Sequence, residues 1–168
     1  MNGGLATLFG FWRRQPAPFR FSWVLQQELA IGPIPRSAGD WALLERAGIR
    51  SRFSCCYLEE EVECCPAPPG LWEKRCSLPD HRDQEPLRAE HLREAINEAR
   101  WLLSNAKPMY LHCLAGQERS ALLAVALVKE QRNLSLLDAL LWVRRTHPPA
   151  SPLYRHLELL ETLSQESN

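Results

Sequence analysis

The stretch from Met109 to Leu127 places one cysteine between two apolar runs, and this arrangement points to nucleophilic chemistry. Cys113 follows the short run MYLH, which predicts a buried strand, and Arg119 directly precedes a run that predicts an apolar helix over 120–131. In α/β sheets, ligands bind beyond the carboxyl ends of the strands, where this loop would lie. Cys113 is therefore a candidate nucleophile.

The loop between the predicted strand and helix has the residue types of an anion site. A helix start presents unpaired N–H groups and the positive end of the helix dipole, which would favour a thiolate at Cys113. Gly116 allows a tight turn, Arg119 offers a planar fork for two oxygens, and Ser120 can hydrogen-bond the thiolate and help it leave. The pattern predicts a thiolate aimed at a phosphorus atom. The predicted phosphate-binding residues are Leu114, Ala115, Gly116, Gln117, Glu118 and Arg119.

Strand and helix patterns alternate along the rest of the chain. Strands are predicted within 28–35, 49–58, 71–78 and 108–112, the third running into a polar loop at Pro79. Helices are predicted within 37–48, 88–104, 120–131, from Ser135 and from Ser151. The acidic, proline-rich stretch 59–70 predicts an exposed loop with little regular structure. Alternating strands and helices predict an α/β domain with a central, largely parallel sheet flanked by helices.

Length and charge restrict the classes of function. The 168 residues predict a flexible N-terminal arm over 1–20 and a single domain over 21–168. Twenty basic residues balance twenty acidic ones, which gives no general attraction to nucleic acid or to an anionic membrane. The opening segment has neither the order of a secretory signal nor the length of a membrane span, so we expect a cytoplasmic protein. An oligomeric state does not follow from the sequence.

The six cysteines predict free thiols rather than a disulfide framework. They stand at 55, 56, 64, 65, 76 and 113, and the two adjacent pairs cannot each close a relaxed disulfide. A metal site among the first five is the alternative, but the C-x-x-C spacing of structural zinc is missing, and we expect no metal or other cofactor. A thiol near Cys113 could trap the oxidised nucleophile as a disulfide.

The run HCLAGQERS resembles the H-C-x-x-G-x-x-R-[ST] signature of the cysteine-dependent protein tyrosine phosphatases, and the short chain resembles their dual-specificity branch. The resemblance extends from Phe21 to Leu163. It implies hydrolysis of phosphotyrosine, and of phosphoserine and phosphothreonine, in phosphoproteins or phosphopeptides through a cysteinyl-phosphate intermediate. The absence of an additional recognition loop favours a shallow cleft that admits all three residues.

The same resemblance implies a general acid upstream of the cysteine. Asp80 has the Pro-Asp context often seen in the family, and Asp83 is the alternative. The acid protonates the leaving oxygen and then deprotonates the hydrolytic water. His112 matches the histidine that organises the loop by hydrogen bonds, a different role from that of a general base.

Two residues of the loop bear on the substrate. Lipid-directed relatives tend to have lysine where Gln117 and Glu118 stand, and a carboxylate there should repel a highly phosphorylated inositol ring. A second interpretation is that Glu118 faces away from the phosphate and holds the loop through an arginine.

Two other functions compete with phosphatase activity. A rhodanese-like sulfurtransferase also uses a loop cysteine at a helix start, although such loops generally hold one residue fewer before the arginine. A phosphoprotein-binding module would keep the fold without turnover, but Cys113, Arg119 and an acid candidate are all present.

Overall fold

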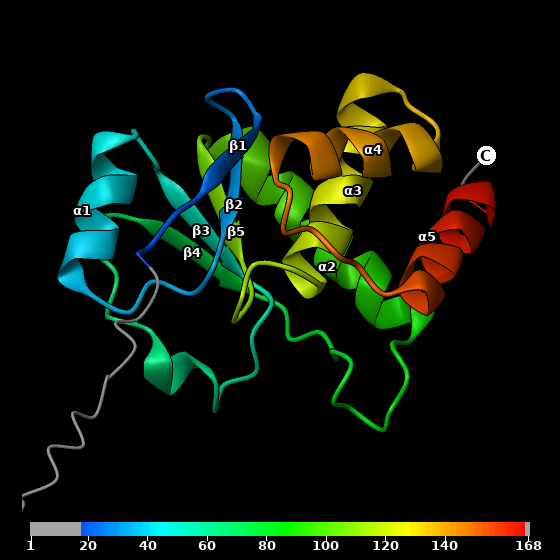
Figure 1. Cartoon of the computed structure of the whole chain (residues 1–168), viewed down its shortest axis with the longest axis horizontal. Coiled ribbons are helices and arrows are strands. Elements are labelled where there is room, and N and C mark those ends of the chain that lie inside the picture. Colours follow the sequence, from blue (N-terminus) through cyan, green and yellow to red (C-terminus); the bar gives the residue numbers. More distant parts are fainter. Residues whose placement is uncertain (1–17, 167–168) are drawn as a thin grey trace, which may run out of the picture.

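A central sheet and five α-helices make up the computed structural model, which describes residues 18–166 (Figure 1). The strands are β1 (Ser22–Leu25), β2 (Leu29–Gly32), β3 (Ser51–Ser54), β4 (Trp72–Arg75) and β5 (Met109–His112). The helices are α1 (Ala38–Arg46), α2 (Ala89–Asn105), α3 (Arg119–Arg132), α4 (Leu136–Thr146) and α5 (Tyr154–Glu166), with a short 3₁₀ helix, η1 (Glu61–Glu63). The strand order is β1-β2-β5-β3-β4. Among the strands of residues 18–166, β1 and β2 pair antiparallel and the other three pairs are parallel, which confirms the predicted largely parallel sheet.

The two faces of the sheet carry hydrophobic cores of different size. Helix α1 covers one face, and helices α2 to α5 lie over the other (Figure 1). The smaller core joins Trp41 and Leu44 of α1 to Tyr110 of β5. The larger core contains four buried residues of α2 that recur in the sequence at the i, i+4, i+7 and i+11 spacing of one helix face: Leu92, Ile96, Ala99 and Leu103. The amphipathic spacing in the sequence therefore predicted the buried face of α2 correctly.

Two segments differ from the sequence-based expectation. Strand β1 was not predicted, because its alternating residues directly follow the proline-rich opening of the chain. Of the predicted arm, residues 1–17 lie outside the described part, and Phe19 packs against Tyr110 with ring centroids 6.2 Å apart. The acidic stretch 59–70, predicted as an irregular loop, contains η1 and contributes contacts to the interior.

The phosphate-binding loop predicted from the sequence packs closely against the end of β2. Gly116 has φ +73°, and a Cβ atom there would lie 2.4 Å from the carbonyl carbon of Gly32. A Cβ atom on Gly32 would in turn lie 2.6 Å from Oη of Tyr110. Gly116 is therefore favoured both by its left-handed backbone and by the lack of space for a side chain. Gly32 is favoured by the lack of space alone.

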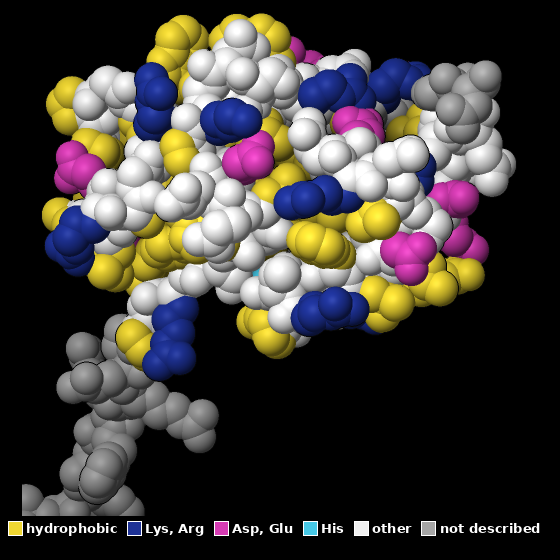
Figure 2. Space-filling view, turned by 90° about the horizontal axis from the view of Figure 1, so that it is seen from above, with side chains coloured by type: hydrophobic (Ala, Val, Ile, Leu, Met, Phe, Trp, Pro, Cys, Tyr) yellow, Lys and Arg dark blue, Asp and Glu magenta, His cyan; other side chains and the backbone are white. Residues whose placement is uncertain are grey.

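The face of the molecule drawn in Figure 2 carries side chains of both charges. Basic and acidic side chains are interspersed there, as the equal numbers of the two types predict. Across residues 18–166, no helix combines the length and the apolar character that crossing a membrane requires.

Replacement of Gly116 by alanine should destabilise the protein. The left-handed backbone and the clash with Gly32 together should lower the free energy of unfolding by about 2 kcal/mol or more. Urea unfolding of Gly116→Ala measures the loss. Gly39→Ala is the control, because Gly39 lies inside α1 with room for a Cβ atom, and its stability should be unchanged or higher. Equal losses in the two variants would contradict the packing described above.

Candidate active site

Cys113 lies at the carboxyl edge of the sheet, directly after its central strand. All four residues of β5 are buried, and Gly32, Ser54 and His112 end their three parallel strands at one level. Ten consecutive residues of α3, from Arg119 to Val128, are also buried. The loop 113–118 is thus fixed at both ends by interior elements.

Neighbouring segments bind the backbone carbonyls of this loop from outside. The N–H of Ile34 donates to the carbonyl of Leu114 at 3.2 Å, and the N–H of Ser151 donates to the carbonyl of Gln117 at 2.7 Å. One donor comes from the segment after β2 and the other from the connection between α4 and α5. Elements far apart in the sequence therefore determine how the loop is turned.

His147, the residue after α4, anchors a third carbonyl. Its Nε2 lies 2.9 Å from the carbonyl oxygen of Gly116, and its Nδ1 lies 2.9 Å from Oγ of Ser22. Burial lowers the pKa of His147, although the bond to Gly116 acts in the opposite direction. The neutral tautomer with a proton on Nε2 fits both contacts, because it donates to Gly116 and accepts from Ser22.

The backbone N–H groups at 114–118 are available to a ligand. None of those at residues 114–118 donates a hydrogen bond to another residue within 18–166. Because the carbonyls at 114, 116 and 117 are held from outside, the amide groups are left for a ligand. Several free N–H groups at a helix start form an anion site.

Arg119 supplies a buried positive charge next to the loop that carries these N–H groups. Its Nη1 and Nη2 lie 2.6 Å and 3.0 Å from the two carboxylate oxygens of Glu60, while its buried Nε has no partner among the described residues. Burial alone would lower the pKa of Arg119, but the bond to Glu60 and the nearby Cys113 raise it. Arg119 is therefore a permanent cation with one donor still free.

The role of Glu60 was missed in the sequence analysis. Burial alone would raise its pKa, but hydrogen bonds from Arg119 outweigh this effect and lower it, so Glu60 is ionised. A buried arginine requires a carboxylate partner. Because the stretch 59–63 holds four glutamates, only their positions in space show which one is the partner.

Asp80 is a buried carboxylate in the segment after β4. Arg82 binds it through Nε and Nη2, at 2.5 Å for the shortest contact, and Nη2 of Arg119 lies 3.5 Å away. Burial alone would raise the pKa of Asp80, but the hydrogen bonds from Arg82 and the charge of Arg119 lower it. Arg82 also binds Glu60 at 3.0 Å, so two carboxylates and two guanidinium groups alternate beside Cys113.

Asp83, the alternative acid, has a different position. Its carboxylate accepts a hydrogen bond from the backbone N–H of Asp80 at 2.6 Å, which closes a turn. Asp80 lines a cleft of about 350 Å³ over the loop, and Asp83 is not part of the lining. The other lining residues are His81, Arg82, Cys113, Leu114, Ala115, Gln117, Glu118 and Arg119.

Ser120 and His112 flank the cysteine as their positions in the sequence suggest. Oγ of Ser120 lies 3.3 Å from Sγ of Cys113, within hydrogen-bonding distance for a thiol or a thiolate. His112 is fully buried, and its Nδ1 lies 3.4 Å from the carbonyl of Cys113. Burial lowers the pKa of His112 to about 3, so the ring is neutral in the ordinary pH range. A neutral, buried ring is compatible with the organising role and not with proton transfer to substrate.

All six cysteines are free thiols, and one of them lies beside Cys113. Cys55 follows β3 at the same edge of the sheet, and its N–H donates to the carbonyl of His112 at 2.8 Å. Burial raises the pKa of Cys55 well above the ordinary range, and the charge of Cys113 raises it further. Cys55 is thus the candidate for the nearby thiol that disulfide trapping would require.

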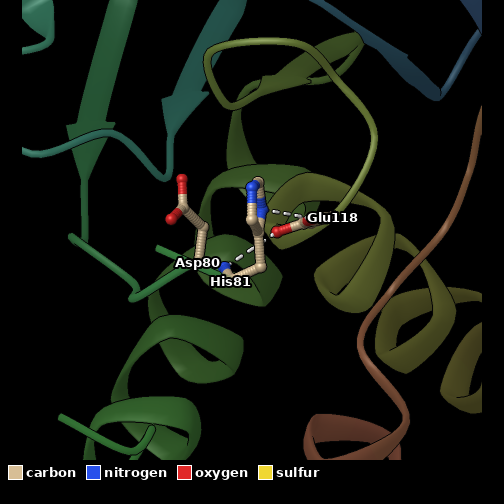
Figure 3. A group of neighbouring side chains, drawn as sticks. All are labelled: Asp80, His81 and Glu118. Atoms are coloured by element: carbon tan, nitrogen blue, oxygen red, sulfur yellow. Dashed lines mark hydrogen bonds and ion pairs between the residues drawn. The ribbon is translucent and has the colours of Figure 1, made fainter. Parts of the chain in front are cut away.

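Glu118 binds the segment that carries the acid candidate, and not an arginine as the second interpretation of the sequence had it. Oε1 of Glu118 lies 2.6 Å from Nδ1 of His81, and the N–H of His81 donates to Oε2 at 3.2 Å (Figure 3). One potential metal-ligand atom from each of Asp80, His81 and Glu118 lies within 4.8 Å of the others, a spacing that a metal ion could bridge. Arg82 already binds both carboxylate oxygens of Asp80, so the group is internally paired.

The known proteins similar to this chain include dual-specificity phosphatases. No model of a known protein family matches the sequence. The chain is 36% identical over 90 residues to the dual specificity protein phosphatase Mpk3 of Drosophila melanogaster, which covers 54% of this chain and 21% of that protein. The chain thus matches about a fifth of the length of this curated relative.

Solved structures extend the likeness over nearly the whole chain. A mouse putative dual specificity phosphatase, crystallised in complex with zinc tungstate, is 26% identical and has a TM-score of 0.72, with 94% of each chain covered. Human DUSP28 is 23% identical and has a TM-score of 0.71, with 91% of this chain and 98% of that chain covered. The fold is that of the cysteine-dependent phosphatases, and the resemblance to their dual-specificity branch is confirmed.

Neutralisation of Glu60 should destabilise the protein, because the buried positive charge of Arg119 loses the carboxylate that pairs with it. We expect Glu60→Gln to lower the free energy of unfolding by roughly 3 kcal/mol, because it removes one partner of a buried ion pair. Denaturant unfolding measures the loss, and added inorganic phosphate should recover part of it by pairing with Arg119.

Glu63→Gln is the matched control for this prediction. Glu63 pairs with Arg36 on the surface, where both side chains are about half exposed. Breaking such a pair should cost about 0.5 kcal/mol or less. Similar losses in the two variants would show that Glu60 does not balance a buried charge.

Proposed function

We propose that this chain is a phosphomonoesterase acting on phosphoproteins through a cysteinyl-phosphate. The observation that carries the proposal is the set of free donors around Cys113: the N–H groups of 114–118 and the buried Nε of Arg119. These donors match the equatorial oxygens of a phosphoryl group. The similarity to dual-specificity phosphatases supports the same reaction class.

The first step forms the bond between Sγ of Cys113 and phosphorus and breaks the ester P–O bond. Arg119 and the loop amides hold the phosphoryl oxygens, while Asp80 gives its proton to the leaving oxygen. Asp80 lines the cleft, as this role requires. A bound phosphate dianion places negative charge beside Asp80, which raises the pKa of its carboxyl and favours the protonated form.

The second step hydrolyses the intermediate. Asp80, now ionised, takes a proton from water as the water oxygen bonds to phosphorus and the S–P bond breaks. Ser120 donates a hydrogen bond to the departing thiolate from its position 3.3 Å away. Arg119 and the amide groups supply the charge stabilisation that a metal ion provides in other phosphatases, so we propose a reaction without cofactor.

The proposed substrates are phosphotyrosine and also phosphoserine and phosphothreonine in proteins or peptides of the cytoplasm. Glu118 keeps a negative charge at the rim of the loop, although His81 binds it, and this disfavours a highly phosphorylated inositol ring. A panel of phosphopeptides and phosphoinositides tests the preference. Dominant activity on phosphoinositides would contradict it.

The nucleophile is tested by hydrolysis of para-nitrophenyl phosphate in EDTA and reductant. Wild-type protein should turn over, and Cys113→Ser should lose activity with its fold intact. A folded but inactive wild-type protein that still binds phosphopeptides would favour the binding module. Transfer of sulfur from thiosulfate, without phosphatase activity, would favour the sulfurtransferase.

The acid is tested by comparing two aspartates. Asp80→Ala should lower kcat about 100-fold for a substrate with a poor leaving group. Asp83→Ala should lower it far less, because Asp83 binds only the backbone of the turn. Steady-state kinetics on phenyl phosphate measure both variants. Equal losses would overturn the choice of Asp80.

The pH profile should report the contact between Arg82 and Asp80. The acid must carry a proton, so kcat/KM falls as pH rises through the pKa of Asp80. Because Arg82 lowers that pKa, Arg82→Ala should move the alkaline limb of the profile to higher pH. Arg75→Ala, which removes a cation bound to Ser77, should leave the limb in place. An unmoved limb in Arg82→Ala would contradict the electrostatic role of Arg82.

A further inference from the structure

The segment carrying the acid candidate touches the phosphate loop and its helix through contacts of unequal strength. Arg119 approaches the carbonyl of Leu78 at 3.4 Å and the carboxylate of Asp80 at 3.5 Å, and both contacts are long. Glu118 makes two shorter contacts with His81, at 2.6 Å to Nδ1 and 3.2 Å to the backbone N–H. The shortest connection between the two segments therefore runs through the residue next to Asp80.

The direction of these side chains separates two roles. In Figure 3, His81 and Glu118 reach toward one another, and the Asp80 carboxylate stands apart from their contact. Asp80 instead interacts with Arg82 of its own segment and with Arg119. The Glu118 carboxylate thus binds the backbone and side chain of His81 and leaves the Asp80 carboxylate to its own partners.

We propose that Glu118 and His81 form a latch that positions Asp80 over Cys113. Both are positioning residues for the leaving-group proton. This inference rests on the proposed function, because it assigns the latch to the step in which Asp80 acts as acid. The Glu118 carboxylate therefore positions the acid, in addition to disfavouring highly phosphorylated substrates.

The latch should affect rate more than stability. His81 is 61% exposed at its side chain and Glu118 is 22% exposed, and a contact with a largely exposed side chain contributes little to folding. A displaced acid slows the reaction only where the leaving oxygen needs a proton. Phenolate leaves slowly without protonation, whereas para-nitrophenolate is stable enough to leave without it.

The experiment compares phenyl phosphate and para-nitrophenyl phosphate in the full chain. Glu118→Ala and His81→Ala should each lower kcat on phenyl phosphate about tenfold, part of the full effect of a general acid. Activity on para-nitrophenyl phosphate should change less than about twofold, and inhibition by inorganic phosphate should be unchanged, because the amide groups are intact. The double variant should be no slower than either single variant.

Two further variants serve as rescue and control. Glu118→Gln should recover most of the rate on phenyl phosphate, since its amide oxygen still accepts from His81. Glu28→Ala breaks the ion pair between Glu28 and Lys107 on the surface and should leave both substrates unaffected. Thermal unfolding of every variant shows whether a lost rate reflects lost fold.

Asp80→Ala, measured on both substrates, separates failure of the latch from failure of the proposed function. If Asp80→Ala shows the leaving-group dependence and Glu118→Ala does not, the latch is wrong and the acid stands. Equal losses on both substrates, or weaker phosphate inhibition, in Glu118→Ala would place Glu118 in phosphate binding and overturn the latch. If Asp80→Ala itself shows no dependence, both the acid and its latch are wrong.

Discussion

The pairing of Arg119 with Glu60 is the interaction on which the site depends. A guanidinium group that is 3% exposed has lost most of its hydration, and such a cation persists in a protein interior only with a compensating anion. Glu60 supplies that anion through two contacts and leaves Nε of Arg119 free. The charge is therefore balanced before substrate arrives, and the arginine is already oriented for a phosphoryl group.

A second feature of the site is the loop around Cys113, in which several N–H groups have no partner among residues 18–166. Ala115 and Gln117 are exposed and line the cleft, so these groups are open to solvent or to a ligand. The carbonyls of the loop are bound by Ile34, His147 and Ser151, which come from two connections outside the loop. The fold in this way holds the loop in a conformation that leaves its N–H groups available to an anion.

The acid segment shows how local and distant contacts combine. Asp83 and Arg82 shape the turn around Asp80 from within three residues of it. Glu118 reaches the same segment from the start of α3, 37 residues away from His81. Solved structures with 23–26% identity share the fold.

The sequence by itself determined the loop, because Cys113, Gly116 and Arg119 are close neighbours and the strand and helix on either side have local patterns. Tertiary structure decided which distant residues complete the site. Glu60 is one of four glutamates in its stretch, and His147 has no motif of its own, so the spacing of residues cannot identify either one. Strand β1 was missed for a related reason, since its pairing with β2 distinguishes it from the proline-rich opening. A buried group is matched with its partner by distance in space, which appears only when the chain has folded.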